Sequence, residues 1–129
     1  MKLEKVTIPI KHILNTKWTM LRSSFIGFFA GVLPGAGASL GSFLAYMFEK
    51  SSSTDKSQFG KGDPRGIAAP EAGNNAAAAG ALVPMLTLGV PGSGTTAVLL
   101  ALLMTLNITP GPLLFTERPE VVWGLTASL

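Results

Sequence analysis

This 129-residue sequence contains no cysteine and a single histidine, His12. The lack of cysteine excludes disulfides and thiolate metal sites. His12 lies in a basic segment without neighbouring residues at metal-ligand spacing. The sequence therefore predicts no metal centre.

Charged residues are also scarce. They make up 13% of the sequence, about half the usual share, while 47% of residues are hydrophobic. No charge interrupts the 26 residues between Arg22 and Glu49 or the 45 residues between Glu71 and Glu117. A bilayer span needs roughly 20 apolar residues, so the first stretch has room for one span and the second for about two. The composition predicts an all-α integral membrane protein.

The charges that are present give a net charge of +3 and flank the apolar stretches. Basic flanks are typical of cytoplasmic loops beside anionic lipid. Residues 1–22 are predicted to form a basic amphipathic segment at the membrane interface, because apolar residues recur there at helical spacing. A solvated linker is the alternative. A basic stripe with aromatic readers is missing, so no nucleic acid is expected as a partner.

Two Pro-Gly pairs, Pro34-Gly35 and Pro91-Gly92, lie within the apolar stretches. Proline and glycine are the residues least suited to a helix interior. In lipid, the freed backbone groups must find partners or line a polar cavity. Transporters build sites from pairs of discontinuous helices in corresponding positions, so the sequence predicts broken or re-entrant helices of an internally repeated transporter fold. Glycines that serve packing alone are the alternative.

The chain divides at these features. We expect an apolar broken helix or re-entrant hairpin over 23–48, where basic residues on both flanks favour the hairpin over one kinked helix. A polar loop is expected over 49–71 and a pair of apolar helices, broken at Pro91-Gly92, over 72–116. Residues 117–129 are expected to form a polar turn and the start of a truncated span, as in a fragment of a longer protein.

The residues at the two breaks are candidates for substrate or ion binding. A half-helix that begins there presents free N–H groups to an anion. Carbonyl and hydroxyl oxygens suit a hard cation such as Na⁺, and no cofactor other than a coupling ion, Na⁺ or H⁺, is expected. The candidates are Pro34, Gly35, Ala36, Gly37 and Ser39 at the first break, and Pro91, Gly92, Ser93, Thr95 and Thr96 at the second.

Three polar residues open the second apolar stretch: Glu71, Asn74 and Asn75. Glu71 follows a proline and is explained either by helix initiation or by ion binding. The two amides are costly in lipid unless they find partners. One interpretation is that the two amides bind substrate or ion, and the other is that they form hydrogen bonds between helices. The binding hypothesis places Asn74, Asn75, Ser39, Ser93 and Thr95 at one shared polar site.

Two stretches loosely resemble enzyme motifs, but the residues or elements that those motifs require are missing. The glycines at 35, 37 and 41 follow no predicted strand, and 92–96 lacks the lysine of a P-loop. Ser93 has no histidine near it in sequence. The chain is therefore predicted not to be an enzyme.

Four strings resemble the TctA-type large permease subunit of the tripartite tricarboxylate transporters. They are GFFAGVLPGAGA (27–38), AAPEAGNNAA (68–77), LTLGVPGS (86–93) and PGPLLF (110–115). The resemblance places the chain at the start of the second half of such a permease. It implies a multi-pass protein of the bacterial inner membrane that imports carboxylates such as citrate by symport.

The resemblance also implies a small membrane subunit and a periplasmic solute-binding protein as partners, with the lipid bilayer around the chain. The alternative is a non-transporting membrane fragment that acts only as a packing or interaction element.

Overall fold

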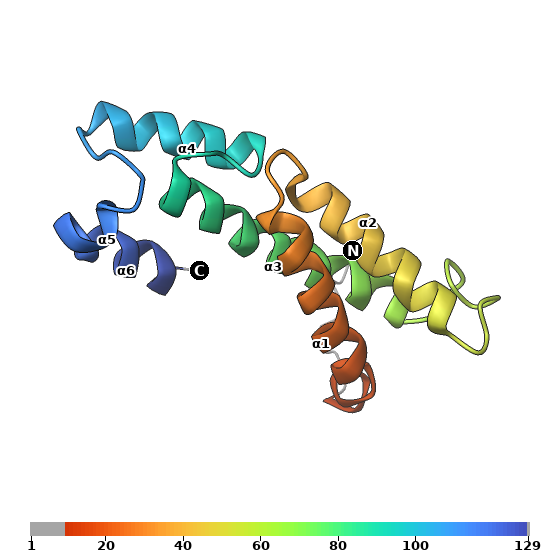
Figure 1. Ribbon diagram of the computed structural model, residues 1–129. Helices are drawn as coiled ribbons and strands as arrows, with labels where there is room; N and C mark the ends of the chain where they lie inside the picture. Colours follow the sequence, from red (N-terminus) through yellow and green to blue (C-terminus); the bar gives the residue numbers. More distant parts are fainter. Residues whose placement is uncertain (1–9, 129) are drawn as a thin grey trace, which may run out of the picture.

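The computed structural model describes residues 10–128, which form helices and connecting loops without a strand. The helices run in the order shown in Figure 1: α1 (Ile10–Val32), α2 (Gly37–Ser52), α3 (Arg65–Leu88), α4 (Gly94–Thr105), α5 (Leu114–Glu117) and α6 (Pro119–Ala127). The expected all-α class is confirmed. Among the described residues, no helix is both long enough and apolar enough to qualify as a membrane span.

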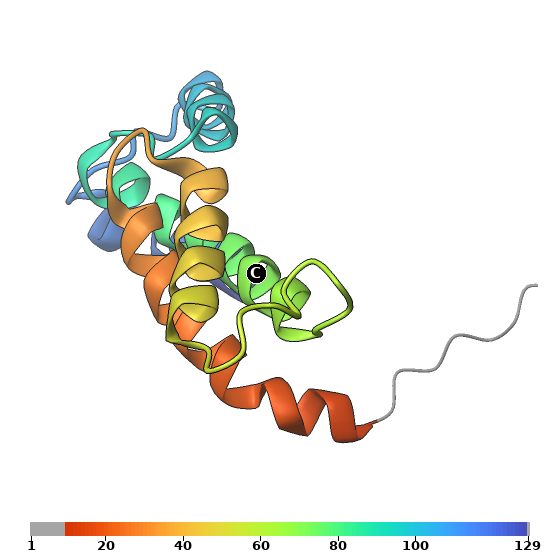
Figure 2. The same ribbon diagram turned by 90° about the vertical axis from the view of Figure 1, so that its right-hand side faces the viewer.

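Helices α1 and α2 form an antiparallel hairpin that packs against α3. The hairpin turns at residues 33–36, and Thr19 of α1 is hydrogen-bonded to Glu49 far along α2. Figure 2 shows that the first turns of α1 bend away from the rest of that helix. Of the expected segment 1–22, residues 1–9 lie outside the described part. Residues 10–22 continue without a break into the apolar residues of α1.

Glycines bring the three helices together at backbone distance. A Cβ atom added to Gly41 would lie 2.6 Å from the Cβ atom of Ala77 and 3.3 Å from the Cα atom of Gly27. One added to Gly73 would lie 2.6 Å from the Cβ atom of Ala45. Small residues permit this close approach of helices in membrane proteins. The α1–α2–α3 unit therefore depends on the absence of side chains at its centre.

The loop between α2 and α3 is shorter than the sequence suggests. Residues 49–71 were expected as a polar loop, but α2 extends to Ser52 and α3 already begins at Arg65. The Asp63 carboxylate accepts the backbone N–H of Arg65 at 2.9 Å, which satisfies one free donor at the helix start. Pro70, expected in a first helical turn, lies inside α3, as does Pro84.

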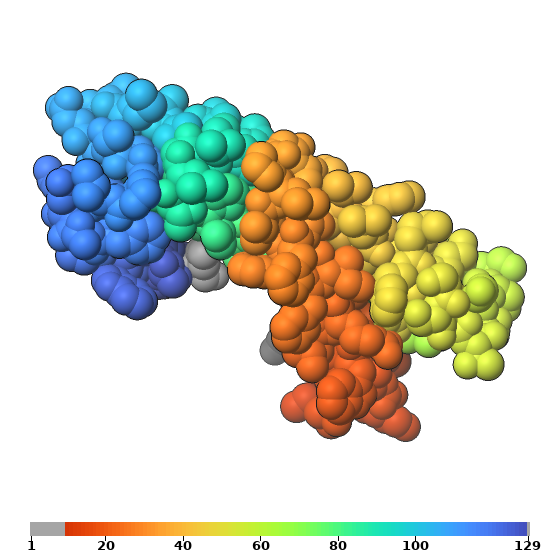
Figure 3. Space-filling view, viewed as in Figure 1, coloured from red at the N-terminus to blue at the C-terminus, as the bar shows by residue number. Residues whose placement is uncertain are grey.

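The remaining helices pack at the far end of α3. A buried cluster joins α3 to α4, α5 and α6, and consists of Met85, Leu86, Leu103, Leu114 and Val122. Figure 3 shows α5 and α6 at one end of the molecule and the 53–64 loop at the opposite end. The cluster fixes the C-terminal half around the second Pro-Gly pair.

Candidate functional site

The two Pro-Gly turns contact each other. The backbone N–H of Gly37, at the start of α2, donates a hydrogen bond to the carbonyl of Gly92, and the N···O distance is 3.1 Å. The first turn joins α1 to α2 and the second joins α3 to α4. Two segments that lie far apart in the sequence thus form one structural unit.

Backbone conformation restricts the first turn to glycine at two positions. Gly35 has a φ of 77° and Gly37 a φ of 67°, both in the left-handed region. Side chains disfavour this region, whereas glycine adopts it freely. The first turn is therefore specified by its glycines as well as by its proline.

The second turn ends α3 and begins α4. Gly89 has a φ of 67° and caps α3, where its N–H donates to the carbonyl of Met85 at 3.0 Å. Gly92 packs against α3, because an added Cβ atom would lie 2.9 Å from the Cα atom of Ala81. Pro91 lies between them and is half-buried. This packing holds the start of α4 beside the first turn.

Ser93 and Thr96 cap α4 with their side chains. The Thr96 hydroxyl accepts the backbone N–H of Ser93 at 2.8 Å, and the Ser93 hydroxyl accepts the N–H of Thr96 at 3.2 Å. This is a reciprocal capping box. Two of the predicted binding residues thus have a structural role in the helix start.

Ser39 and Thr95 differ from that pair. Both are exposed, and neither side chain is hydrogen-bonded to another residue in the described part of the chain. Their hydroxyls therefore remain available to a ligand.

A cavity of about 550 Å³ opens beside the two turns and is here called the break cavity. Six of the predicted site residues line it, together with apolar side chains from α3, α4 and α6. Its lining comprises Gly35, Gly37, Ala38, Ser39, Ala78, Leu82, Ser93, Gly94, Thr95, Thr96, Leu99, Leu125 and Ser128. The predicted residues Pro34, Ala36, Pro91 and Gly92 belong to the turns and do not line the cavity.

The predicted polar residues of α3 lie outside the break cavity. Asn74 lines a second cavity of about 420 Å³, between α2 and α3, that we call the Asn74 groove. Glu71 and Asn75 line a third, of about 350 Å³, beside His12 of α1. Successive residues on a helix point about 100° apart, so the adjacent amides face different cavities. Ser39 lines both the break cavity and the Asn74 groove, and connects the two.

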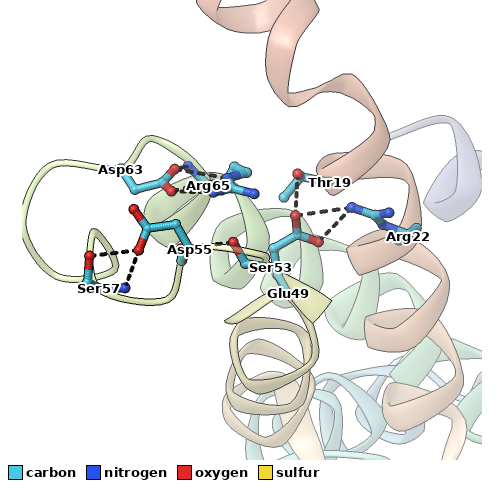
Figure 4. Close-up of polar contacts among 8 residues, drawn as sticks. All are labelled: Thr19, Arg22, Glu49, Ser53, Asp55, Ser57, Asp63 and Arg65. Carbon is cyan, nitrogen blue, oxygen red and sulfur yellow. Dashed lines mark hydrogen bonds and ion pairs between the residues drawn. The ribbon is translucent and has the colours of Figure 1, made fainter. Parts of the chain in front are cut away.

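A buried carboxylate, that of Glu49, was not predicted from the sequence. Glu49 is only 2% exposed and accepts a hydrogen bond from the Thr19 hydroxyl at 2.7 Å. The Arg22 guanidinium donates to both of its oxygens, at 3.0 and 3.1 Å (Figure 4). In the sequence, Arg22 and Glu49 were interpreted only as the charged flanks of an apolar stretch. The spacing of Thr19 and Arg22, one helical turn apart, was the available signal.

A second ion pair orders the neighbouring loop. Arg65 donates to both carboxylate oxygens of Asp63, with a closest contact of 2.6 Å. These hydrogen bonds hold the pKa of Asp63 below its usual value. A hydrogen bond from the Ser57 hydroxyl likewise lowers the pKa of Asp55. Both carboxylates are therefore ionised at neutral pH.

Helix ends that meet around a hydroxyl-lined cavity are typical of membrane transporters. The whole chain, residues 1–129, matches the Tripartite tricarboxylate transporter TctA family. The chain therefore belongs to this family, as its four sequence strings predicted. It is a family of membrane transporters, so the prediction that the chain is not an enzyme is also confirmed.

Two relatives from Agrobacterium vitis are similar to this chain. One, an uncharacterized 52.8 kDa protein in the TAR-I ttuC′ 3′ region, is 40% identical over 110 residues, which cover 85% of this chain and 22% of that protein. The other, an uncharacterized protein in the TAR-II ttuC′ 3′ region, is 43% identical over 103 residues, or 80% and 43% of the two chains. The chain thus spans less than half the length of either relative. No solved structure matches it significantly.

Proposed function

We propose that this chain forms part of a secondary-active permease that imports tricarboxylates or related carboxylates, such as citrate, across the bacterial inner membrane. A gradient of Na⁺ or H⁺ drives the import by symport. A periplasmic solute-binding protein delivers the substrate, and a small membrane subunit completes the multi-pass complex. The match of the whole chain to the TctA family carries this proposal, and the break cavity beside the two hydrogen-bonded turns supports it.

The chemistry of the cavity suits a carboxylate. Its described lining holds no charged side chain, so an anion would be bound by hydroxyls and by backbone N–H groups. Ser39 and Thr95 supply hydroxyls that have no hydrogen-bond partner among residues 10–128, and the N-terminus of α4 adds the positive end of a helix dipole. The transported substrate can then leave, because no fixed positive charge retains it.

The outer surface of the helices is consistent with lipid. Large apolar side chains are exposed along them, including Trp18 at 63%, Phe29 at 66% and Trp123 at 71%. Soluble monomers rarely expose apolar surface on this scale. A lipid environment would cover these side chains.

The test is uptake of radiolabelled citrate by vesicles that contain the whole permease and its partners, with an imposed Na⁺ or pH gradient. Removing a hydroxyl by Ser39→Ala or Thr95→Val should raise the KM for citrate about tenfold, because a hydrogen bond to a charged group is lost. Thr105→Val is the matched control, since the Thr105 hydroxyl bonds to a carbonyl of its own helix at the other end of α4.

Unchanged uptake in both cavity variants would contradict the assignment of the break cavity. The absence of any citrate uptake by the intact complex, under both gradients, would instead favour the alternative of a packing or interaction element.

A further inference from the structure

The Asn74 groove leads away from the break cavity along two helix faces. On α2, Ser39, Ser42 and Tyr46 line it and lie on one face at helical spacing. On α3, Asn74 lies one turn from Ala78, which lines the break cavity. Because Ser39 lines both cavities, the groove and the break cavity lie next to each other.

Polar side chains in this groove lack partners within the described residues. Ser42 and Asn74 are half-buried, and neither makes a side-chain hydrogen bond to another described residue. An unpaired hydroxyl or amide in an apolar region costs free energy. Both groups are hydrogen-bond donors that suit a carboxylate, and a passing carboxylate would satisfy them.

A cation lies near one end of the groove, and a helix N-terminus lines the break cavity next to the other end. At the end near the 53–64 loop, the Lys50 ammonium lies 5.8 Å from the centre of the Tyr46 ring, and Tyr46 lines the groove. Beyond Ser39, the N-terminus of α4 with its helix dipole lines the break cavity. Charge of one sign at the ends of a groove draws in ions of the opposite sign.

We propose that the Asn74 groove is the path by which the carboxylate substrate moves between the 53–64 loop and the break cavity. Ser42 and Asn74 donate hydrogen bonds to it on the way, and Lys50 attracts it at the outer end. This inference rests on the proposed function and adds a route to it. A lipid chain or another helix of the permease would fill the groove if the inference were wrong.

The absence of cysteine from this chain allows a direct test. We would introduce Ser42→Cys or Asn74→Cys into the whole permease, with cysteines elsewhere replaced, and measure the rate of labelling by a water-soluble, anionic methanethiosulfonate. Ser24→Cys is the matched control, because Ser24 is also a half-buried serine but lines an apolar depression with Phe25 and Phe28.

We expect the two groove cysteines to react at least about tenfold faster than the control, because the groove concentrates anions. Saturating citrate should slow the reaction, and labelling should block uptake. Equally slow labelling at positions 42 and 24, or a rate at both groove positions that citrate leaves unchanged, would overturn the inference. Citrate uptake by the unlabelled variants is measured in parallel. Failed labelling of variants that still take up citrate refutes the path alone, whereas the absence of citrate uptake by the unsubstituted complex contradicts the proposed function.

Discussion

At the scale of single residues, Gly73 illustrates how a missing methyl group determines the packing of three helices. An alanine there would place its Cβ atom 2.6 Å from the Cβ atom of Ala45 and 2.8 Å from the carbonyl oxygen of Gly41. The second of these contacts is with backbone, which has little freedom to yield. Gly73 therefore fixes the distance between α2 and α3.

We expect Gly73→Ala to lower the free energy of unfolding by about 1–3 kcal/mol, the usual cost of overpacking. Thermal unfolding of the purified protein in detergent would measure it. Gly124→Ala is the control, because a Cβ atom at this position of α6 meets nothing within 4 Å. Helix propensity alone should make that variant neutral or more stable by up to about 1 kcal/mol. Equal effects at the two positions would contradict this role for Gly73.

Local chemistry accounts for where the helices are interrupted. The chain leaves the helix at Pro34-Gly35 and at Pro91-Gly92, whereas the internally repeated transporter fold predicted from these pairs stays a prediction. The start of α3 was placed too late because a proline is common in a first helical turn. In the structure α3 begins at Arg65, where the Asp63 carboxylate accepts hydrogen bonds from the backbone N–H and from the side chain of Arg65.

At the scale of the helices, two features hold α1 and α2 together as a hairpin. One is the short turn at 33–36, and the other is the contact of Arg22 and Thr19 with the buried carboxylate of Glu49. A buried carboxylate that loses its partner is costly, because its desolvation is no longer compensated. This contact therefore keeps the two helices in register.

A double-mutant cycle tests this contact. Arg22→Met and Glu49→Gln should each destabilise the protein, and the double variant should lose less than the sum, with a coupling energy of roughly 0.5–3 kcal/mol. The matched cycle uses Arg118 and Glu120, whose charged groups are 3.9 Å apart and mostly exposed, and we expect a coupling below about 1 kcal/mol there. A coupling at Arg22 and Glu49 no larger than in this exposed pair would show that the contact is incidental.

Contacts between distant helices were harder to predict from the sequence than the helices themselves. The contact between Gly37 and Gly92 depends on how α2 and α4 pack on α3, and local patterns do not encode such distant pairs. The different surroundings of Asn74 and Asn75 follow instead from helical geometry. The hypothesis that Asn74 and Asn75 belong to one binding site stays a prediction. In the structure the two side chains line different cavities.

At the scale of the whole molecule, this chain spans 22% and 43% of its two relatives. The break cavity is open, and its walls come from α2, α3, α4 and α6 with their adjoining turns. Alternating access in transporters with internal repeats requires one repeat to move against another. Under the proposed function, the counterpart of these paired turns would belong to the rest of the permease.

We therefore expect the 129-residue chain, reconstituted alone in vesicles, to show no citrate uptake above that of empty vesicles under either gradient. The whole permease in matched vesicles is the positive control, and recovery of the chain with the lipid after flotation verifies its insertion. Measurable uptake by the chain alone would contradict the need for the rest of the permease.

The order of the helices along the chain has a consequence for biosynthesis. Translation completes α1 and α2 before α3 leaves the ribosome, so the surface that carries Gly27 and Gly41 exists for a time without its partner. The contact between Arg22 and Glu49 lies within the hairpin and needs no later residue. It can hold the nascent helices together until Gly73 is synthesised, so that α3 packs against a preformed surface.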